Sequence, residues 1–371
     1  MKLVIFIGHF KTGSTSIQSF LSSNYLRLLR AGILYPSVES KGISRNLRAA
    51  VSGKDIPTLG ESLNIIEPHN ALALRLKNEE DKHGIPPYYP ALPSGFQMLE
   101  MIENQISDLN PHSAIICSEV FALLGLTEQR KSIERLAARF GRHDVTIYCN
   151  LRRPDDYISS WHRQRLKFGA KLDRLHDGAL DQYLDSAHFQ QAKMIDGWVK
   201  DHFSNARLII RNYDDVMSAG GAVKDFINNS EIIFPKNITL PENQNPSIPC
   251  AFAELGRRCL HDLPREEARR LVSWLSSAKA RQTIPHVPDS QVEMFGPKYR
   301  EVLLNNFRPV AESLNEMTQT YPFYQEVEDF GRCRPVPEIE AANEALPKLV
   351  RIAKLQGLPE TVLEWLNDWK F

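Results

Sequence analysis

The sequence has no excess of charge of either sign. It contains 45 lysine and arginine residues and 45 aspartate and glutamate residues, so its formal net charge at pH 7 is zero. A general nucleic-acid-binding protein would carry a basic excess, and we therefore expect no nucleic-acid partner. The rest of the composition, with 42% hydrophobic and 24% charged residues, is that of an ordinary globular protein.

Long apolar runs are also absent. No stretch approaches the roughly 18 residues that a membrane-spanning helix needs. The first apolar stretch ends at Ile7, is too short for the apolar region of a signal peptide, and reads as a core strand of the fold. The sequence therefore predicts no integral membrane segment and no signal peptide.

Cysteine is sparse, and its spacing matches no metal site or redox motif. The five cysteines lie at positions 117, 149, 250, 259 and 333, with no CxxC pair among them. We interpret Cys117 and Cys149 as small core residues of a protein in a reducing compartment. The sequence also lacks a DxD motif, so we expect no metal site.

The most informative segment is a glycine loop near the start of the chain. An apolar run ends at Gly8, residues 8–15 read Gly-His-Phe-Lys-Thr-Gly-Ser-Thr, and a helical pattern follows directly. Unpaired N–H groups at a helix start attract anions, and glycine lets the backbone approach them closely. The lysine precedes the second glycine, whereas the nucleotide-triphosphatase loop GxxxxGK(S/T) places it afterwards. The pattern predicts a site for a phosphate-like group other than ATP; the simpler interpretation is a glycine turn with a solvated lysine.

A second candidate site follows a predicted strand in the middle of the chain. Residues 145–151 are rich in β-forming residues, Arg152 comes at their end, and Pro154 suits the first turn of a helix. Ser160 then lies about two turns into that helix. Together Arg152 and Ser160 offer a guanidinium fork and a hydroxyl to a second phosphate. The alternative is a structural arginine that pairs with one of the two aspartates just after it.

Taken in this order, the two segments resemble the sulfotransferases that use 3′-phosphoadenosine 5′-phosphosulfate as donor. The resemblance is strongest over residues 1–40, 114–121, 145–168 and 206–227, extends weakly to about residue 323, is weak in 41–100, and is absent from 326–371. It implies that one set of residues binds the 5′-phosphosulfate of the donor and another binds the 3′-phosphate. The first set is Gly8, Lys11, Thr12, Gly13, Ser14 and Thr15, and the second is Arg152 and Ser160.

The resemblance also implies the bacterial, soluble type of this family. The Golgi sulfotransferases of animals usually carry a membrane anchor that this sequence lacks, so we expect a cytoplasmic protein. The family transfers a sulfuryl group by direct in-line displacement, without a metal, onto a hydroxyl or amine acceptor. We expect a carbohydrate or a lipid-linked sugar as the acceptor, with residues 41–100 as the variable segment that faces it.

Two residues are the candidates for catalysis. In the family the loop lysine contacts the bridging and leaving oxygens of the donor, a role that falls on Lys11. Glu119 follows a predicted strand and would take the proton of the acceptor, as general-base catalysis requires. The alternatives are Glu39 after the second strand, one of the histidines His9 and His162, and a purely structural role for Glu119.

Two other classes of function remain compatible with a phosphate-binding loop. One is a P-loop nucleotide kinase or NTPase, which the position of the lysine and the lack of a strand ending in a Walker-B aspartate argue against. The other is a non-catalytic nucleotide-binding protein, which the presence of Lys11, Arg152 and Ser160 argues against.

Strands that alternate with helices predict an α/β fold of the P-loop-like, three-layer type, with a central parallel sheet flanked by helices and a helical C-terminal tail. Ligands of such sheets bind beyond the carboxyl ends of the strands, where both candidate sites are expected. The expected strands cover residues 2–7, 33–35, 114–118, 145–151 and 206–211. The expected helices cover residues 14–30, 96–109, 128–140, 154–168, 180–201, 216–229, 249–262, 264–280 and 308–320.

We expect one sulfotransferase domain over residues 1–325. Within it, the proline-rich residues 83–94 read as a loop. Residues 326–371 read as a linker followed by a helical C-terminal extension, whose helices offer a surface through which two copies of the chain could associate.

Overall fold

The computed structural model of the protein describes residues 1–58, 60–82, 84–240 and 247–369. These residues form two compact units. The first unit comprises Met1–Arg152 and Gln190–Asn243, and the second comprises Arg153–Phe189 and Gln244–Phe371. The chain leaves the first unit after Arg152, and the C-terminal helices belong to the second, smaller unit. The expected domain boundary after residue 325 stays a prediction.

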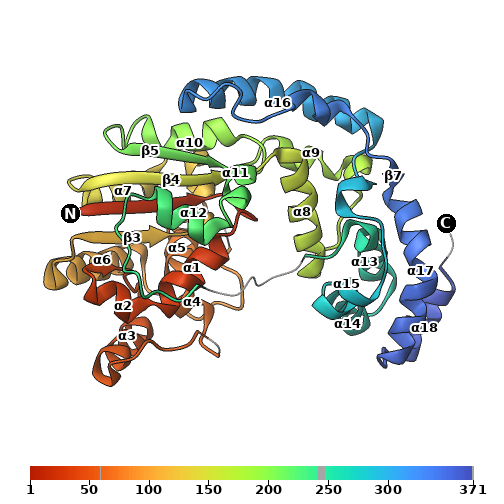
Figure 1. Ribbon diagram of the computed structural model, residues 1–371, viewed down its shortest axis with the longest axis horizontal. Helices are drawn as coiled ribbons and strands as arrows, with labels where there is room; N and C mark the ends of the chain where they lie inside the picture. Colours follow the sequence, from red (N-terminus) through yellow and green to blue (C-terminus); the bar gives the residue numbers. More distant parts are fainter. Residues whose placement is uncertain (59, 83, 241–246, 370–371) are drawn as a thin grey trace. The chain divides into compact units, whose positions relative to one another are not determined.

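The first unit is built on a five-stranded parallel sheet (Figure 1). Its strands follow the order β2-β3-β1-β4-β5, so that β1 lies in the middle. In a parallel sheet that helices cover on both faces, strands read as continuous apolar runs, and residues 3–7 of β1 are all completely buried. The strands are β1 (Lys2–Gly8), β2 (Ile33–Leu34), β3 (Ser113–Cys117), β4 (Asp144–Leu151) and β5 (Arg207–Asn212).

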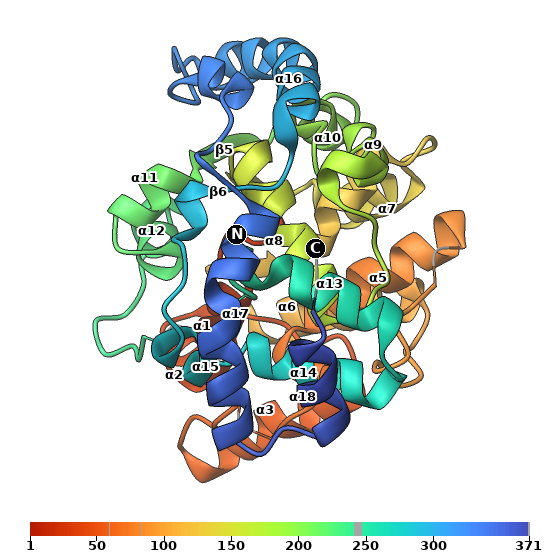
Figure 2. The same ribbon diagram turned by 90° about the vertical axis from the view of Figure 1, so that its right-hand side faces the viewer.

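Helices cover both faces of this sheet, as Figures 1 and 2 show together. One face carries α1 (Ser14–Ser23), α2 (Tyr25–Arg30), α11 (Tyr213–Ser218) and α12 (Ala222–Asn229). The other carries α5 (Pro68–Asp81), α6 (Gly95–Leu109), α7 (Lys131–Phe140) and α10 (Gln191–Val199). The prediction of an α/β fold with a central parallel sheet flanked by helices is confirmed. Cys117 and Cys149 are free, buried residues of the sheet, as expected.

A buried aspartate holds α12 against the sheet. Asp225 is completely buried and accepts a hydrogen bond from the Tyr148 hydroxyl at 2.7 Å. Arg211 on β5 donates to both oxygens of the same carboxylate. The Phe6, Tyr148 and Phe226 rings pack edge-on or stacked around this network. A buried charge is tolerated because several donors satisfy it, and the start of α12 is thereby fixed in position.

Several expected helices are interrupted. The expected helix 14–30 breaks at Asn24, which separates α1 from α2. The Asn24 side chain donates to the carbonyls of Phe20 and Thr239 and accepts from the Thr239 N–H. Asparagine side chains compete with the backbone for hydrogen bonds in this way. The expected helices 180–201 and 216–229 are likewise each divided in two.

The segment 41–100, which matched no motif, contains helices that the sequence did not predict. They are α3 (Ser40–Ser52), α4 (Leu63–Ile66) and α5 (Pro68–Asp81). Within the expected loop 83–94, the described residues 84–94 contain no helix or strand, as predicted, and residue 83 lies outside the described residues. This segment thus supplies much of the first unit beside β2 and β3.

The second unit is mainly helical. It contains α8 (Pro154–Lys167), α9 (Asp181–Leu184), α13 (Ala253–Asp262), α14 (Arg265–Leu275), α15 (Ala278–Thr283), α16 (Gly296–Thr318), α17 (Glu338–Leu355) and α18 (Glu360–Asn367). The short strands β6 (Val292–Glu293) and β7 (Val336–Pro337) pair in parallel. The buried Arg300 on α16 forms two ion pairs. Its Nη1 lies 3.2 Å from Asp155 Oδ2, and its Nε lies 3.0 Å from Glu293 Oε2.

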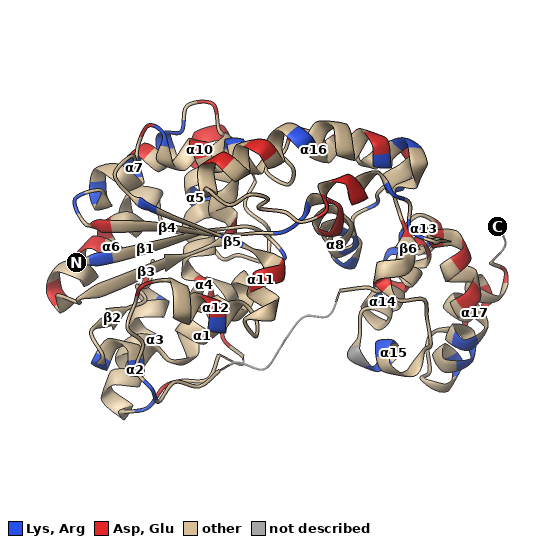
Figure 3. Ribbon diagram, turned by 45° about the horizontal axis from the view of Figure 1, so that its top comes forward, with Lys and Arg blue, Asp and Glu red and all other residues tan. Residues whose placement is uncertain are grey.

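Four 3₁₀ helices and one short π-helix, η2, are also present among the described residues. They are η1 (Glu119–Leu126), η2 (Leu175–Ala179), η3 (Cys250–Phe252), η4 (Asp289–Gln291) and η5 (Val327–Gly331). Acidic and basic residues are interspersed along the helices of both units (Figure 3). Among the described residues, no helix is both long enough and apolar enough to cross a membrane.

Candidate phosphate-binding site and a pair of glutamates beside it

The glycine loop lies at the carboxyl end of the central strand. β1 ends at Gly8 and α1 begins at Ser14, so residues 9–13 connect the middle of the sheet to a helix. From β1 the chain moves to β2 and β3 on one side of the sheet and then crosses to β4 on the other. The loop therefore lies where the direction of winding reverses, which is the usual binding place of doubly wound sheets.

Gly13 brings two helix starts together. It has a φ of +91°, which favours glycine, and a Cβ at this position would lie 2.3 Å from the Cβ of Ala222, the first residue of α12. The Gly13 carbonyl accepts the N–H groups of Ser16 and Ile17, but no side chain caps the start of α1. The start of α12, at Gly221, has no side-chain cap either. Two uncapped helix N-termini therefore meet, and both favour an anion.

The remaining loop residues are held from within the loop and from β4. The Thr12 hydroxyl donates to the His9 carbonyl at 2.5 Å, and the His9 N–H donates to the Asn150 carbonyl at 3.0 Å. Lys11 is partly exposed and adopts a left-handed backbone conformation with a φ of +59°. Such conformations are uncommon for residues other than glycine and gather at functional sites. The ammonium group of Lys11 thus belongs to the same short loop as the start of α1.

Arg152 lies directly after β4, on the neighbouring strand. Its guanidinium carbon lies 5.1 Å from the centre of the Tyr213 ring, and its carbonyl accepts a hydrogen bond from the Gln191 side chain at 2.8 Å. Stacking on an aromatic ring leaves the planar donors of an arginine available at its edge. Ser160 lies on α8 in the second unit, whereas Arg152 belongs to the first unit. That these two residues share one phosphate therefore stays a prediction.

Glu119 is hydrogen-bonded to α1, the helix that begins at the glycine loop. It is the first residue of η1, directly after β3 and Ser118, and is partly buried. Gln18 on α1 donates to its Oε2 at 2.7 Å, and Asn70 on α5 donates to its Oε1 at 3.3 Å. Burial raises the pKa of Glu119, while hydrogen bonds from its own N–H and from the Ser14 hydroxyl oppose that rise. The carboxyl group thus lies next to the first turn of α1.

A second carboxyl group, which the sequence did not single out, accompanies Glu119. Asn70 Nδ2 also donates to Glu67 Oε2, at 2.8 Å, so that one amide joins the two glutamates. Burial raises the pKa of Glu67 from 4.5 to about 8, and the negative charge of Glu119 adds to this rise. Two neighbouring carboxylates resist ionising together. Near neutral pH the pair therefore holds a proton.

The other candidate bases have structural roles in this fold. Glu39 caps α3, because its two oxygens accept the N–H groups of Lys41 and Gly42 at 3.0 and 2.7 Å. His9 is completely buried within the loop. His162, in the second unit, accepts or donates a hydrogen bond with the Tyr183 hydroxyl, and burial lowers its pKa to about 3. His162 is therefore neutral at physiological pH.

Glu67 and Asn70 could be recognised only in part from the sequence. The pair Glu67-Pro68 is a typical helix start, because proline suits the first helical position. Nothing in the sequence indicates that Asn70 faces β3, where its Oδ1 accepts a hydrogen bond from the Ser118 hydroxyl at 2.6 Å. Polar residues on a helix are usually solvated, so the signal for a buried amide bridge was absent.

No family model matches the chain, and no similar protein was found among curated proteins or solved structures. Among the described residues, no group of three or more histidine, cysteine, aspartate or glutamate side chains is arranged to hold a metal ion. The function must therefore be argued from the residues of the loop, of the two glutamates and of Arg152.

The raised pKa of Glu67 predicts how stability depends on pH. The folded protein keeps a proton that the unfolded chain releases above pH 4.5, so the contribution of Glu67 is fully present below pH 4.5 and is lost as the pH rises to about 8. We expect Glu67→Gln to remove this loss and to stabilise the protein at pH 8 relative to wild type, by on the order of a few kcal/mol. Urea unfolding of both proteins between pH 5 and 8.5 measures it.

Glu134→Gln, at an exposed position on α7, is the matched control and should leave the pH dependence of the wild type unchanged. If the stability of wild type and Glu67→Gln changed in parallel between pH 5 and 8.5, Glu67 would be ionised in the folded protein over this whole range, and the prediction would be wrong.

Proposed function

We propose that the protein is a sulfotransferase that uses 3′-phosphoadenosine 5′-phosphosulfate. The observation that carries this proposal is the meeting of two uncapped helix N-termini at Gly13, beside Lys11 and at the carboxyl end of the central strand. This arrangement suits a dense anionic group. The lysine lies before the second glycine, where the sulfotransferase motif has it, rather than after it as in the NTPase loop.

The residues fit the donor by their chemistry. Backbone N–H groups at the start of α1, the hydroxyls of Ser14 and Thr15, and the Lys11 ammonium would bind the 5′-phosphosulfate. Arg152, stacked on Tyr213, would bind the 3′-phosphate from the neighbouring strand, with Ser160 as its partner. Under this proposal the α/β unit is of the P-loop-like type, adapted to a donor that carries a 5′-phosphosulfate and a 3′-phosphate in place of a 5′-triphosphate.

The proposed reaction is an in-line transfer. An oxygen or nitrogen of the acceptor forms a bond to sulfur, the bond between sulfur and the bridging oxygen breaks, and adenosine 3′,5′-bisphosphate leaves with the electron pair. Lys11 stabilises the charge that develops on the leaving phosphate. Glu119 takes the proton of the acceptor. Burial raises the pKa of Glu119, and a carboxylate with a raised pKa is the stronger base for accepting a proton.

Glu67 supports the same chemistry. A neutral Glu67 removes one negative charge from the surroundings of an anionic donor. Asn70 joins the two carboxyl groups, so their protonation is coupled. We further propose a carbohydrate or a lipid-linked sugar as the acceptor, since hydroxyl groups are the nucleophiles that a single carboxylate base can activate.

The first test is nucleotide selectivity. Adenosine 3′,5′-bisphosphate should raise the melting temperature more than ATP with magnesium does, because a ligand of the folded state stabilises it. Arg152→Ala should weaken binding of the bisphosphate by roughly 10- to 150-fold, the equivalent of about 1.5–3 kcal/mol for a charged hydrogen bond, and leave adenosine 5′-monophosphate nearly unaffected. Calorimetry measures both.

Preferential binding of ATP with magnesium would instead support a kinase or NTPase. The control variant is Arg142→Ala, which removes an arginine at an exposed position.

The second test is the loop lysine. Lys11→Ala should lose most sulfuryl transfer while the protein stays folded, because a partly exposed loop lysine contributes little to the core. Turnover with labelled donor and circular dichroism measure the two effects. The exposed Lys54→Ala provides the control for loss of a positive charge, and a wild-type rate for Lys11→Ala would refute its catalytic role.

The third test is the general base. Glu119→Gln keeps the hydrogen bonds that its carbonyl oxygen can accept but cannot take a proton, so turnover should fall by about 10²- to 10⁴-fold with little change in bisphosphate affinity. Glu39→Gln should retain most turnover, because Glu39 serves as a helix cap. The reverse result, with Glu39→Gln inactive and Glu119→Gln active, would assign the base to Glu39.

A further inference from the structure

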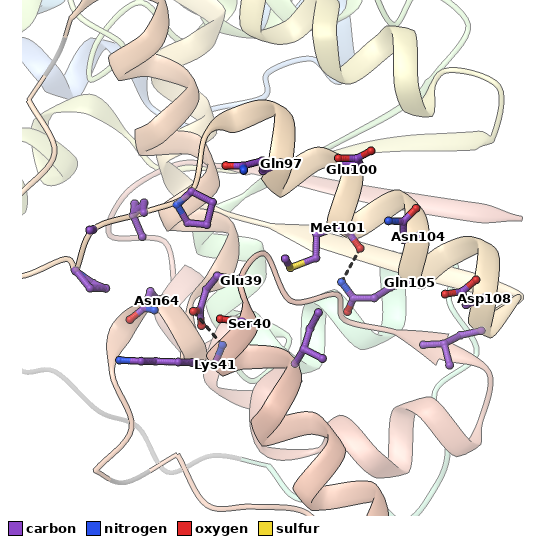
Figure 4. A pocket seen from close by; sticks show the side chains of 16 residues that line it. Glu39, Ser40, Lys41, Asn64, Gln97, Glu100, Met101, Asn104, Gln105 and Asp108 are labelled. Carbon is purple, nitrogen blue, oxygen red and sulfur yellow. Dashed lines mark hydrogen bonds between the residues drawn. The ribbon is translucent and has the colours of Figure 1, made fainter.

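The first unit contains a pocket to which the proposed donor chemistry assigns no role. Its volume is about 1050 Å³, at the upper end of the range of roughly 300–1,000 Å³ for small-molecule sites. The start of α3, α4, residues 90–93 and one face of α6 line it (Figure 4). All of these elements belong to the first unit. The pocket is thus a feature of one unit and is formed without the second.

A buried amide oxygen lines this pocket without a hydrogen-bond partner. Asn64 is 2% exposed, and its Oδ1 accepts no hydrogen bond from any described residue. The residue is the single polar member of α4, which otherwise reads Leu63, Ile65 and Ile66. A buried polar atom without a partner is unfavourable and calls for an explanation. The atom itself is buried, so a hydroxyl or amine of a bound molecule would supply the missing donor once the Asn64 side chain turns toward the pocket.

A row of unpaired polar side chains faces the pocket from α6. Glu100, Asn104 and Asp108 recur every four residues and therefore share one side of the helix, as Figure 4 shows. Within the described part of the chain, neither Glu100 nor Asp108 forms an ion pair. Glu103, on another side of the same helix, pairs with both Arg139 and Arg142. The carboxyl groups of Glu100 and Asp108 are thus left available, whereas that of Glu103 is neutralised and that of Glu39 caps α3.

The lining favours one class of ligand. Three carboxylates, those of Glu39, Glu100 and Asp108, face a single ammonium group, that of Lys41, so the pocket repels anions and attracts amines. Ile43, Met101 and two prolines add apolar surface between the polar groups. Sugar rings combine hydroxyl groups at their edges with apolar C–H faces, and amides and carboxylates are suitable partners for those hydroxyls.

We propose that this pocket binds an oligosaccharide that bears hydroxyl and free amine groups and carries no acidic groups. The claim that the pocket binds such a sugar depends only on the pocket residues. The claim that the bound sugar is the sulfate acceptor rests on the proposed function. Tyr89 directly precedes Pro90, a residue of the pocket lining. Burial and the charges of Glu67 and Glu119 raise the pKa of Tyr89. The pocket lining at Pro90 is therefore directly preceded by a residue in the neighbourhood of the glutamate pair.

Calorimetry of the full chain with four probes tests the proposal. We expect the glucosamine trimer to bind at least about tenfold more tightly than its N-acetylated form, and trigalacturonate to show no binding. Equal binding of trigalacturonate would overturn the charge argument. Spermine that binds as tightly as the glucosamine trimer would overturn the carbohydrate class, because charge alone would then suffice.

Variants locate the binding. Glu100→Gln with Asp108→Asn should weaken the glucosamine trimer at least about tenfold and leave the N-acetylated trimer nearly unchanged. Asn64→Leu should weaken both trimers, with a melting temperature equal to or above that of wild type. If Asn64→Leu does not fold, the exposed Asn104→Ala must show the same loss for both trimers. Glu103→Gln is the matched control, and unchanged affinities in all pocket variants would refute the site.

Adenosine 3′,5′-bisphosphate binding, measured on the same samples, separates the two proposals. If the protein binds the sugar but not the bisphosphate, the pocket proposal is supported and the proposed sulfotransferase function is refuted. Bisphosphate binding without sugar binding supports the donor site and refutes this pocket proposal.

Discussion

The close contact between Gly13 and Ala222 brings the partial positive charges of two helix N-termini together in the first unit. Because no side chain fits between these two residues, the starts of α1 and α12 lie within van der Waals reach of each other. Each start exposes uncapped N–H groups, and the two partial positive charges add at one place. The buried Asp225, bound by Tyr148 and Arg211, holds α12 in the position on which this contact depends. The anion site is therefore a product of sheet packing and loop sequence together.

Two carboxyl groups lie close to this candidate anion site. Glu119 lies next to the first turn of α1, and Glu67 is joined to it through Asn70. Two full negative charges here would oppose the binding of an anion. Burial and mutual repulsion instead favour one shared proton in the pair. The shared proton thus lowers the negative charge beside the start of α1.

The segment between β2 and β3 forms the other part of the proposed chemistry. α3, α4 and α5 bring Glu39, Asn64 and Glu67 to one side of the first unit, and α6 adds its row of polar residues. Under the proposed function, the donor-binding groups would come from the loops that follow strands. Groups that meet the second substrate would come from this inserted helical segment. In α/β folds, function is generally carried by sites grafted onto the fold rather than by the fold itself.

The sequence by itself determined the five strands of the central sheet, the class of fold and the position of the glycine loop, but not the short strands β6 and β7 of the second unit. These features are local: an apolar run, a glycine, a proline at a helix start and the order of strands and helices all appear in the residues themselves, and each of the five strands was predicted to within one residue at either end. The role of Lys11, Arg152 and Ser160 remains a prediction. The tertiary structure decided the rest. Glu67 lies 52 positions from Glu119, and Asn64 lies 40 positions from Asn104. Whether such residues meet depends on how separate helices pack on the sheet, which no local pattern encodes.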